Sequence, residues 1–200
     1  MKSEYKNTPT IETKRLILRK FTEKDVESIY KLYKDEEVNT FLPLFPLRSK
    51  NEASELLKEK YLKTYENPRG YHYAVCQKSE FEPIGYVIVN MDESHDLGYA
   101  LRTEFWHRGI ITEAVKGVIE RIKADGLVYL TATHDVNNPR SGHVMRNVGM
   151  RYCYTYEELW KPKNISVHFR LYQLNLDGNK DRIYKGYWNK YNKHYVERNI

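Results

Sequence analysis

The first half of the chain alternates strand-like and helix-like patterns. Residues 12–21 alternate apolar and polar side chains closely enough to predict a half-buried strand. Thr22 then caps a helix whose apolar positions recur at helical spacing. A second helix is predicted to begin at Ser49 or Asn51 and to end before the turn at residues 67–70. The chain therefore opens with one strand and two helices.

The second half combines strands with one clear amphipathic helix. Strands are predicted at residues 71–78, 84–91, 97–102, 127–134, 150–160 and 166–174, and helices at residues 112–125 and from Ser141 to Gly149. The strand at 97–102, the following helix and the strand at 127–134 form a βαβ unit, whose two strands should run parallel. The predicted fold class is α+β, with a mostly antiparallel sheet.

Composition narrows the class of protein. The chain has 200 residues, 40% of them hydrophobic and 30% charged, which fits one globular domain. No run approaches the roughly 18 apolar residues of a membrane span, and no apolar signal segment begins the chain, so we expect a cytoplasmic protein without membrane contact. The two cysteines and seven histidines show no ligand spacing, so no metal is expected.

Positive charge and aromatic residues gather at the C-terminal end. The net charge is +6, and residues 178–200 contribute +4 of it, from six bases and two acids. The remainder is too nearly neutral for duplex DNA. If this segment is helical, one face carries Tyr184, Tyr187, Trp188, Tyr191 and Tyr195. That face would dock onto the domain or onto a second copy in a homodimer; the alternative is contact with RNA or the ribosome.

The segment with the clearest chemistry is residues 105–114, between the strand at 97–102 and the amphipathic helix. A glycine at such a junction directs several backbone N–H groups and a helix N-terminus toward one point, which suits a pyrophosphate. His107 and Arg108 add donors and positive charge there. The segment lacks the glycine patterns of nucleotide P-loops and Rossmann sites.

Five short motifs occur in order across residues 11–175. They are Thr13 to Arg19, Ile84 to Tyr86, Leu97 to Tyr99, Phe105 to Ala114, and Asn138 to Met150. This combination resembles the GNAT superfamily of N-acetyltransferases and, within it, the ribosomal-protein N-terminal (alanine/serine) acetyltransferases. The resemblance implies a sheet splayed between its fourth and fifth strands, helices on both faces, and acetyl-CoA in the split. It assigns residues 1–177 to the acyltransferase domain and residues 178–200 to a C-terminal extension.

The resemblance also implies which residues bind the cofactor. The pyrophosphate would lie against backbone N–H groups beside His107, at positions Arg108, Gly109, Ile110, Ile111 and Thr112. The family usually has glycine or alanine where Ile111 stands. Leu101 and Arg102 match the strand end that pairs with pantetheine and polarises the thioester carbonyl. Asn138 matches the asparagine that bonds the pantetheine arm, and Ser141 lies near the sulfur.

Acetyl transfer by direct attack in a ternary complex requires a base and a proton donor. Ser141 matches the serine that protonates the leaving thiolate in the ribosomal-protein branch. For the base the sequence offers Glu158, with Glu157 and Asp96 as alternatives, and we favour Glu158.

The acceptor is expected to be a primary amine, and three alternatives remain open from the sequence. The first is a peptide N-terminus, such as that of a ribosomal protein. The second is a small amine of the aminoglycoside or polyamine type. The third is a non-catalytic GNAT-fold module that contacts RNA through its basic tail. The acceptor pocket would be built by the loops around residues 35–50 and 157–166.

Overall fold

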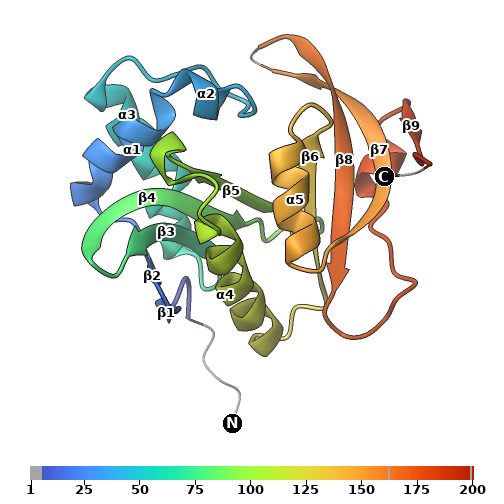
Figure 1. Cartoon of the computed structure of the whole chain (residues 1–200), viewed down its shortest axis with the longest axis horizontal. Coiled ribbons are helices and arrows are strands. Elements are labelled where there is room, and N and C mark those ends of the chain that lie inside the picture. The colour runs from blue at the N-terminus through green and yellow to red at the C-terminus, as the bar shows by residue number, and fades with distance from the viewer. Residues whose placement is uncertain (1–5, 162, 199) are drawn as a thin grey trace.

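The strands form two sheets that separate from one another at one end (Figure 1). The computed structural model describes residues 6–161, 163–198 and 200. The first sheet has the order β1-β2-β3-β4-β5 and the second β6-β8-β7-β9. The strands are β1 (Ile11–Glu12), β2 (Leu16–Arg19), β3 (Tyr71–Gln77), β4 (Glu80–Val89), β5 (Leu97–Leu101), β6 (Tyr129–Asp135), β7 (Arg151–Trp160), β8 (Ile165–Asn175) and β9 (His194–Tyr195). The helices are α1 (Val26–Tyr33), α2 (Glu36–Asn39), α3 (Lys50–Lys60), α4 (Ile110–Ala124), α5 (Pro139–Asn147) and α6 (Gly186–Lys190).

The two sheets meet at β5 and β6. Their only bridge among the described residues is a parallel one between Asp96 and Thr131, where the Thr131 N–H donates to the carbonyl of His95 at 3.3 Å. Beyond it the two strands diverge. The predicted α+β class and the predicted splay are confirmed. Counted from the sequence, β5 and β6 are the fourth and fifth strands, because the two-residue β1 was not predicted.

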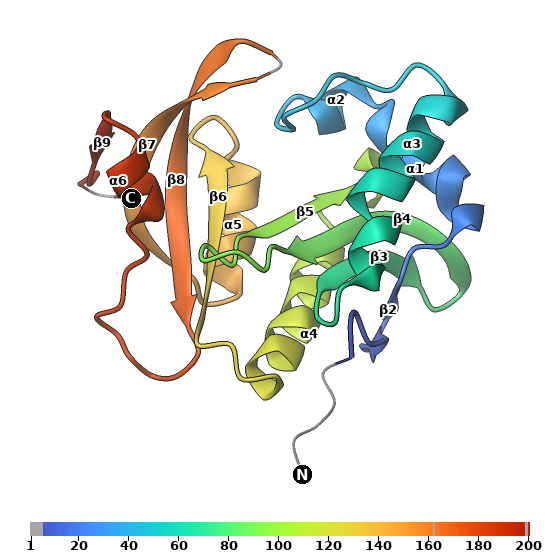
Figure 2. The same ribbon diagram turned by 180° about the vertical axis from the view of Figure 1, so that it is seen from behind.

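Helices cover both faces of the first sheet. On one face α4 buries Val115, Val118 and Ile122 in the main core, and α5 adds Met145 to that core. Helices α1 and α3 cover the opposite face (Figure 2). There Tyr33 of α1 and Leu57 of α3 pack with Tyr86 of β4 in a second core cluster. The apolar spacing of each helix therefore sets which face of the sheet it covers.

Local capping explains where the helices begin. The Ser49 hydroxyl accepts a hydrogen bond from the Glu52 N–H at 3.2 Å and caps α3, as predicted. Helix α5 is capped by Asn138, whose side-chain oxygen accepts from the Ser141 N–H at 3.3 Å. The prediction that Ser141 caps this helix is therefore wrong, since Pro139 already occupies the first helical position.

The C-terminal segment is not the continuous helix that the aromatic spacing suggested. Only Gly186–Lys190 is helical, and His194–Tyr195 then adds a strand to the edge of β7. The rings of the segment pack on the second sheet around Tyr154 and Tyr156; they belong to Tyr184, Tyr187, Trp188 and Tyr191. Backbone pairing with β7 therefore ends the helix before Tyr191 and Tyr195 can join it.

Candidate active site

The loop before α4 forms a concave group of backbone donors. His107 and Gly109 both have left-handed backbones, with φ of 59° and 67°. Gly109 is the N-cap, so the N–H groups of Ile110, Ile111 and Thr112 have no partner within the helix. Such a turn at a helix N-terminus suits a diphosphate. The exposed side chains of His107 and Arg108 flank it. The predicted pyrophosphate segment therefore has a geometry that fits the group.

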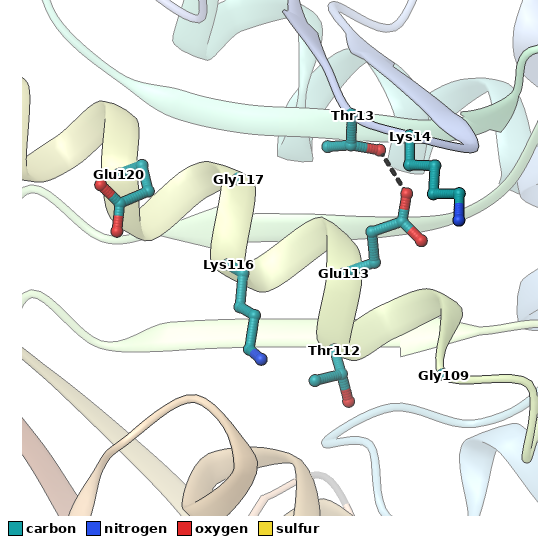
Figure 3. Close-up of a pocket in the computed structure, with 8 residues that line it drawn as sticks. All are labelled: Thr13, Lys14, Gly109, Thr112, Glu113, Lys116, Gly117 and Glu120. Carbon is teal, nitrogen blue, oxygen red and sulfur yellow. Dashed lines mark hydrogen bonds between the residues drawn. The ribbon is translucent and has the colours of Figure 1, made fainter.

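Side chains from the Thr13–Arg19 motif and from α4 hold this loop in place. The Glu113 carboxylate accepts from the Thr13 hydroxyl at 2.6 Å (Figure 3). It also accepts from the Arg15 Nε at 2.6 Å. Arg15 also donates to the Arg108 carbonyl at 2.9 Å. Although partial burial opposes the effect, the bonds from Thr13 and Arg15 lower the pKa of Glu113. The Thr13–Arg19 motif thus has a structural role at the loop that its sequence position alone did not reveal.

A depression of about 520 Å³ runs along α4 beside the turn between β1 and β2. Thr112 and Lys116 line it from one side of the helix, and Glu113 points the other way, toward Thr13 (Figure 3). It adjoins the donor loop at Gly109 but lies along the outer side of α4, beside β1 and β2. It is therefore not the place of acetyl transfer.

The edge of β5 that faces the splay offers backbone donors. The Arg102 N–H donates to the Ile84 carbonyl at 2.9 Å, on the β4 side. Because N–H groups alternate between the two edges of a strand, those of Tyr99 and Leu101 point to the other edge, toward β6. The Leu101 carbonyl on this edge accepts from the Trp106 indole at 2.7 Å. Leu101 thus has the predicted orientation, whereas the Arg102 N–H is already engaged, so that part of the prediction is wrong.

A hydroxyl pair spans the splay on the α4 and α5 side. The Tyr99 hydroxyl lies 2.9 Å from the Ser141 Oγ and 2.9 Å from the Ser141 carbonyl. Burial raises the pKa of Tyr99, so this hydroxyl stays protonated at neutral pH. The sequence singled out Ser141 but not Tyr99 as a proton donor. The signal for Tyr99 was its place in the Leu97–Tyr99 motif, two residues after Leu97 and therefore on the same face of β5, toward α4.

Asp96 lies on the opposite face of β5. Side chains alternate along a strand, and since Leu97 and Tyr99 pack toward α4, Asp96 points the other way. Burial raises the pKa of Asp96 to about 7, and the charges of Asp92 and Glu158 act in the same direction, against a hydrogen bond from Thr131. A carboxylate with this pKa can exchange a proton near neutral pH.

The two glutamates of β7 point to opposite faces of the second sheet. Glu158 lies on the Asp96 side, because its charge contributes to the raised pKa of Asp96. Glu157 lies on the other face, where it accepts from the Ser166 hydroxyl and pairs with Lys193 at 3.0 Å. These bonds lower the pKa of Glu157, which is poorly suited to act as a base. Glu158 therefore lies on the face of β7 that also carries Tyr156, and its charge acts on Asp96, whereas Glu157 lies on the other face.

Asn138 stands where α5 begins, with its carboxamide oxygen used in the helix cap. The NH₂ group has no hydrogen-bond partner among the described residues and remains a possible donor toward the splay. The described part of the chain contains no group of three or more metal-binding side chains. Nor is any described helix long and apolar enough to cross a membrane.

Comparison with known proteins agrees with this geometry. Residues 15–151 match the acetyltransferase (GNAT) domain family. An uncharacterized N-acetyltransferase of Bacillus subtilis, YoaA, is 25% identical over 148 residues, 72% of this chain and 83% of that protein.

Two solved structures share the fold. One is RimL, the ribosomal L7/L12 alpha-N-protein acetyltransferase in complex with coenzyme A, with a TM-score of 0.74 and 17% identity over 84% of this chain and 99% of that one. The other is the microcin C7 self-immunity acetyltransferase MccE with acetyl-CoA and AMP, with a TM-score of 0.69 and 17% identity over 82% and 93% of the two chains. The resemblance to ribosomal-protein N-terminal acetyltransferases is thus confirmed at the level of the fold. The chain belongs to the GNAT family of acetyltransferases and is an acetyl-CoA-dependent N-acetyltransferase.

Proposed function

We propose that the chain transfers an acetyl group directly to a primary amine bound on the Asp96 face of β5, while coenzyme A lies on the Tyr99 face. The observation that carries this proposal is the alternation of β5, which puts a carboxylate with a pKa of about 7 on one face and a hydroxyl pair on the other. A base and a proton donor on opposite sides of the reacting bond are what the reaction requires.

In this proposal the donor loop at positions 107–112 binds the diphosphate, and the free β5 edge at Tyr99 and Leu101 pairs with pantetheine. Asn138 donates to the pantetheine arm through its NH₂ group. Acetyl-CoA, when bound, supplies an acetyl thioester. The N–H groups of the β5 edge stabilise negative charge on the thioester oxygen.

The proton path follows from the same arrangement. Asp96 takes a proton from the bound ammonium, and the freed nitrogen lone pair forms a bond to the acetyl carbon. The carbon–sulfur bond breaks, and the thiolate takes a proton from the Ser141 hydroxyl. The nitrogen gives up its second proton to solvent as the amide forms, and Ser141 regains a proton from solvent through Tyr99. Glu158 acts through Asp96, because its charge helps to hold the Asp96 pKa near 7. This revises our sequence-based preference for Glu158 as the base.

The first acceptor candidate is a peptide N-terminus, and the fold likeness to RimL supports it. A small amine is the second candidate, and a contact between the β7–β8 turn and the end of α2 favours it. The Lys163 Nζ, at the β7–β8 turn, donates to the Asn39 carbonyl at 2.5 Å, at the end of α2. A long peptide would have to pass beneath this contact.

The test is to incubate the protein with acetyl-CoA and a panel of peptides and small amines, and to follow the release of free thiol. We expect amine-dependent thiol release from at least one class. Binding of coenzyme A without turnover of any amine would instead support a non-catalytic module, and RNA binding through residues 178–200 would then be measured.

A further inference from the structure

The C-terminal segment covers the same face of the second sheet on which Glu158 lies. Its rings pack against β7, and the ring of Tyr156 lies 5.1 Å from that of Tyr187 and 4.9 Å from that of Tyr191. The segment therefore forms one wall of the acceptor face, opposite α1 and α3 (Figure 2). The family match ends at residue 151, before any of these tyrosines.

Non-local bonds fix the position of this wall. His194–Tyr195 pairs with Thr155 and Tyr156 of β7. The Glu197 carboxylate accepts two bonds from Arg170 of β8, at 2.9 and 2.6 Å. Bidentate arginine–carboxylate pairs are strong and directional. The rings upstream are thus anchored at the C-terminal end of the segment.

Two tyrosines of the wall lie near the two carboxylates: Tyr187 lines a hollow with Ser94, and Tyr191 is close to Glu158. Burial raises the pKa of the Tyr187 hydroxyl, and the neighbouring charge of Asp96 raises it further. Burial and the Glu158 carboxylate likewise raise the pKa of Tyr191. Tyr187 also lines a depression of about 340 Å³ between the segment and the loop that leads to Asp96. This hollow therefore lies between Tyr187 and Ser94, two residues before Asp96 in the chain.

We propose that Tyr187 and Tyr191 are positioning residues of the acceptor site, which exclude water from Asp96 and Glu158 and hold the two carboxylates against Tyr156. This inference rests on the proposed function, in which Asp96 is the base. It makes the C-terminal segment a part of the catalytic domain and not an appended tail.

The physical reason is that water screens charge. The titratable groups on the side of Asp96 are Asp92 of the preceding loop, Glu158 and Tyr156 of β7, and Tyr184 and Tyr187 of the segment. Tyr99 lies on the other face of β5, and its pKa is raised by the Asp96 charge. Lys190 lies near Glu158. Removing a ring would admit water, weaken the repulsion between the carboxylates and lower the pKa of Asp96 toward its ordinary range.

The experiment compares Tyr187→Ala with Tyr187→Phe, using spermidine and a hexapeptide that begins with serine as acceptor probes. In Tyr187→Ala the midpoint of the kcat/KM rise with pH should fall by about one unit or more, and the KM of the acceptor should rise roughly tenfold. The KM of acetyl-CoA should stay within about twofold. Tyr187→Phe keeps the ring and should keep the midpoint.

Trp188→Ala is the matched control for lost packing. Its ring lies 5.3 Å from that of Tyr154, away from the carboxylates, so this variant should lower Tm without moving the pH midpoint. The inference is overturned if Tyr187→Ala behaves like Trp188→Ala, with a lower Tm and an unchanged midpoint and acceptor KM. If the unmodified protein acetylates neither probe nor any amine of the wider panel, the proposed function fails first and this inference fails with it.

Discussion

The two faces of β5 are built in different ways. On the cofactor face, the groups that we assign to coenzyme A are mostly backbone N–H groups, at the α4 N-terminus and on the β5 edge, and they lie within the family match at residues 15–151. On the acceptor face they are side chains, and Glu158, Tyr187 and Tyr191 all lie beyond that match. Backbone sites tolerate sequence change, because every residue except proline supplies an N–H. The identity of the cofactor can therefore be inferred from a family sequence pattern, whereas the identity of the acceptor cannot.

The sharpest way to test this division is Asp96→Asn. We expect kcat/KM to fall by roughly 10²–10³, because the amide cannot accept the ammonium proton. The affinity for coenzyme A should be unchanged, since Asp96 lies on the other face. In the unmodified protein kcat/KM should rise with pH through about 7, where Asp96 loses its proton, and this rise should be absent from the variant. A variant that loses coenzyme A affinity as well would break the comparison.

The same substitution has an opposite effect on stability. The folded-state pKa of Asp96, about 7, lies above the ordinary aspartate value of 3.8, so the folded protein holds this proton more tightly than the unfolded chain. This group therefore makes the free energy of unfolding decrease as pH rises from about 4 to 7. Asp96→Asn removes that loss and should raise Tm at pH 8 but not at pH 4, as thermal unfolding at the two pH values would show.

Asn138→Ala should act on the cofactor face alone. It removes the proposed donor to pantetheine and the cap of α5, and we expect the Kd of coenzyme A to rise about tenfold or more, or roughly 1–3 kcal/mol. Calorimetric titration would measure it. Asn138→Asp keeps an oxygen for the cap but loses the NH₂ donor and adds a negative charge, so a loss of affinity in Asn138→Ala alone would assign the effect to the cap.

A smaller effect is expected at Gly109. Its φ of 67° is unfavourable for any residue with a Cβ, by about 1–2 kcal/mol, although an added Cβ would meet only the Arg15 guanidinium, at 3.8 Å. Gly109→Ala should weaken coenzyme A binding up to tenfold and leave the KM of the acceptor unchanged. Gly126→Ala, which has a similar φ of 79° far from the donor loop, is the control for strain without a site.

The smallest effect is expected for Tyr99→Phe. It removes the hydrogen bonds of the Tyr99 hydroxyl to the Ser141 carbonyl and hydroxyl, and the net contribution of each such bond is about 0.5–1.5 kcal/mol. We expect kcat to fall about fivefold with both KM values unchanged. Ser141→Ala should cost more, and the double variant should be no worse than Ser141→Ala, because both residues serve one proton. Additive losses would show that they act separately.

Local patterns sufficed for most of the fold. The periodicity of α4, the cap at Ser49 and the β5–β6 splay all depend on neighbouring residues or on motifs in register, and they were predicted. The tail was not, because its strand at His194–Tyr195 exists only through pairing with β7, about 40 positions earlier. The environment of Asp96 was also hidden. Its pKa depends on Glu158 and Asp92, and no sequence spacing reveals that these charges meet.

The Lys163 contact has a consequence for turnover. The two sheets are joined at one end by the bridge at Asp96. The β7–β8 turn is in addition tied to the end of α2, because the Lys163 ammonium donates to the Asn39 carbonyl. A hydrogen bond from a charged group contributes about 1.5–3 kcal/mol, so this hydrogen bond would be broken in roughly one molecule in ten to one in a hundred and fifty. Entry of a bulky acceptor would then require this hydrogen bond to break, whereas a slender acceptor could enter while the hydrogen bond is intact.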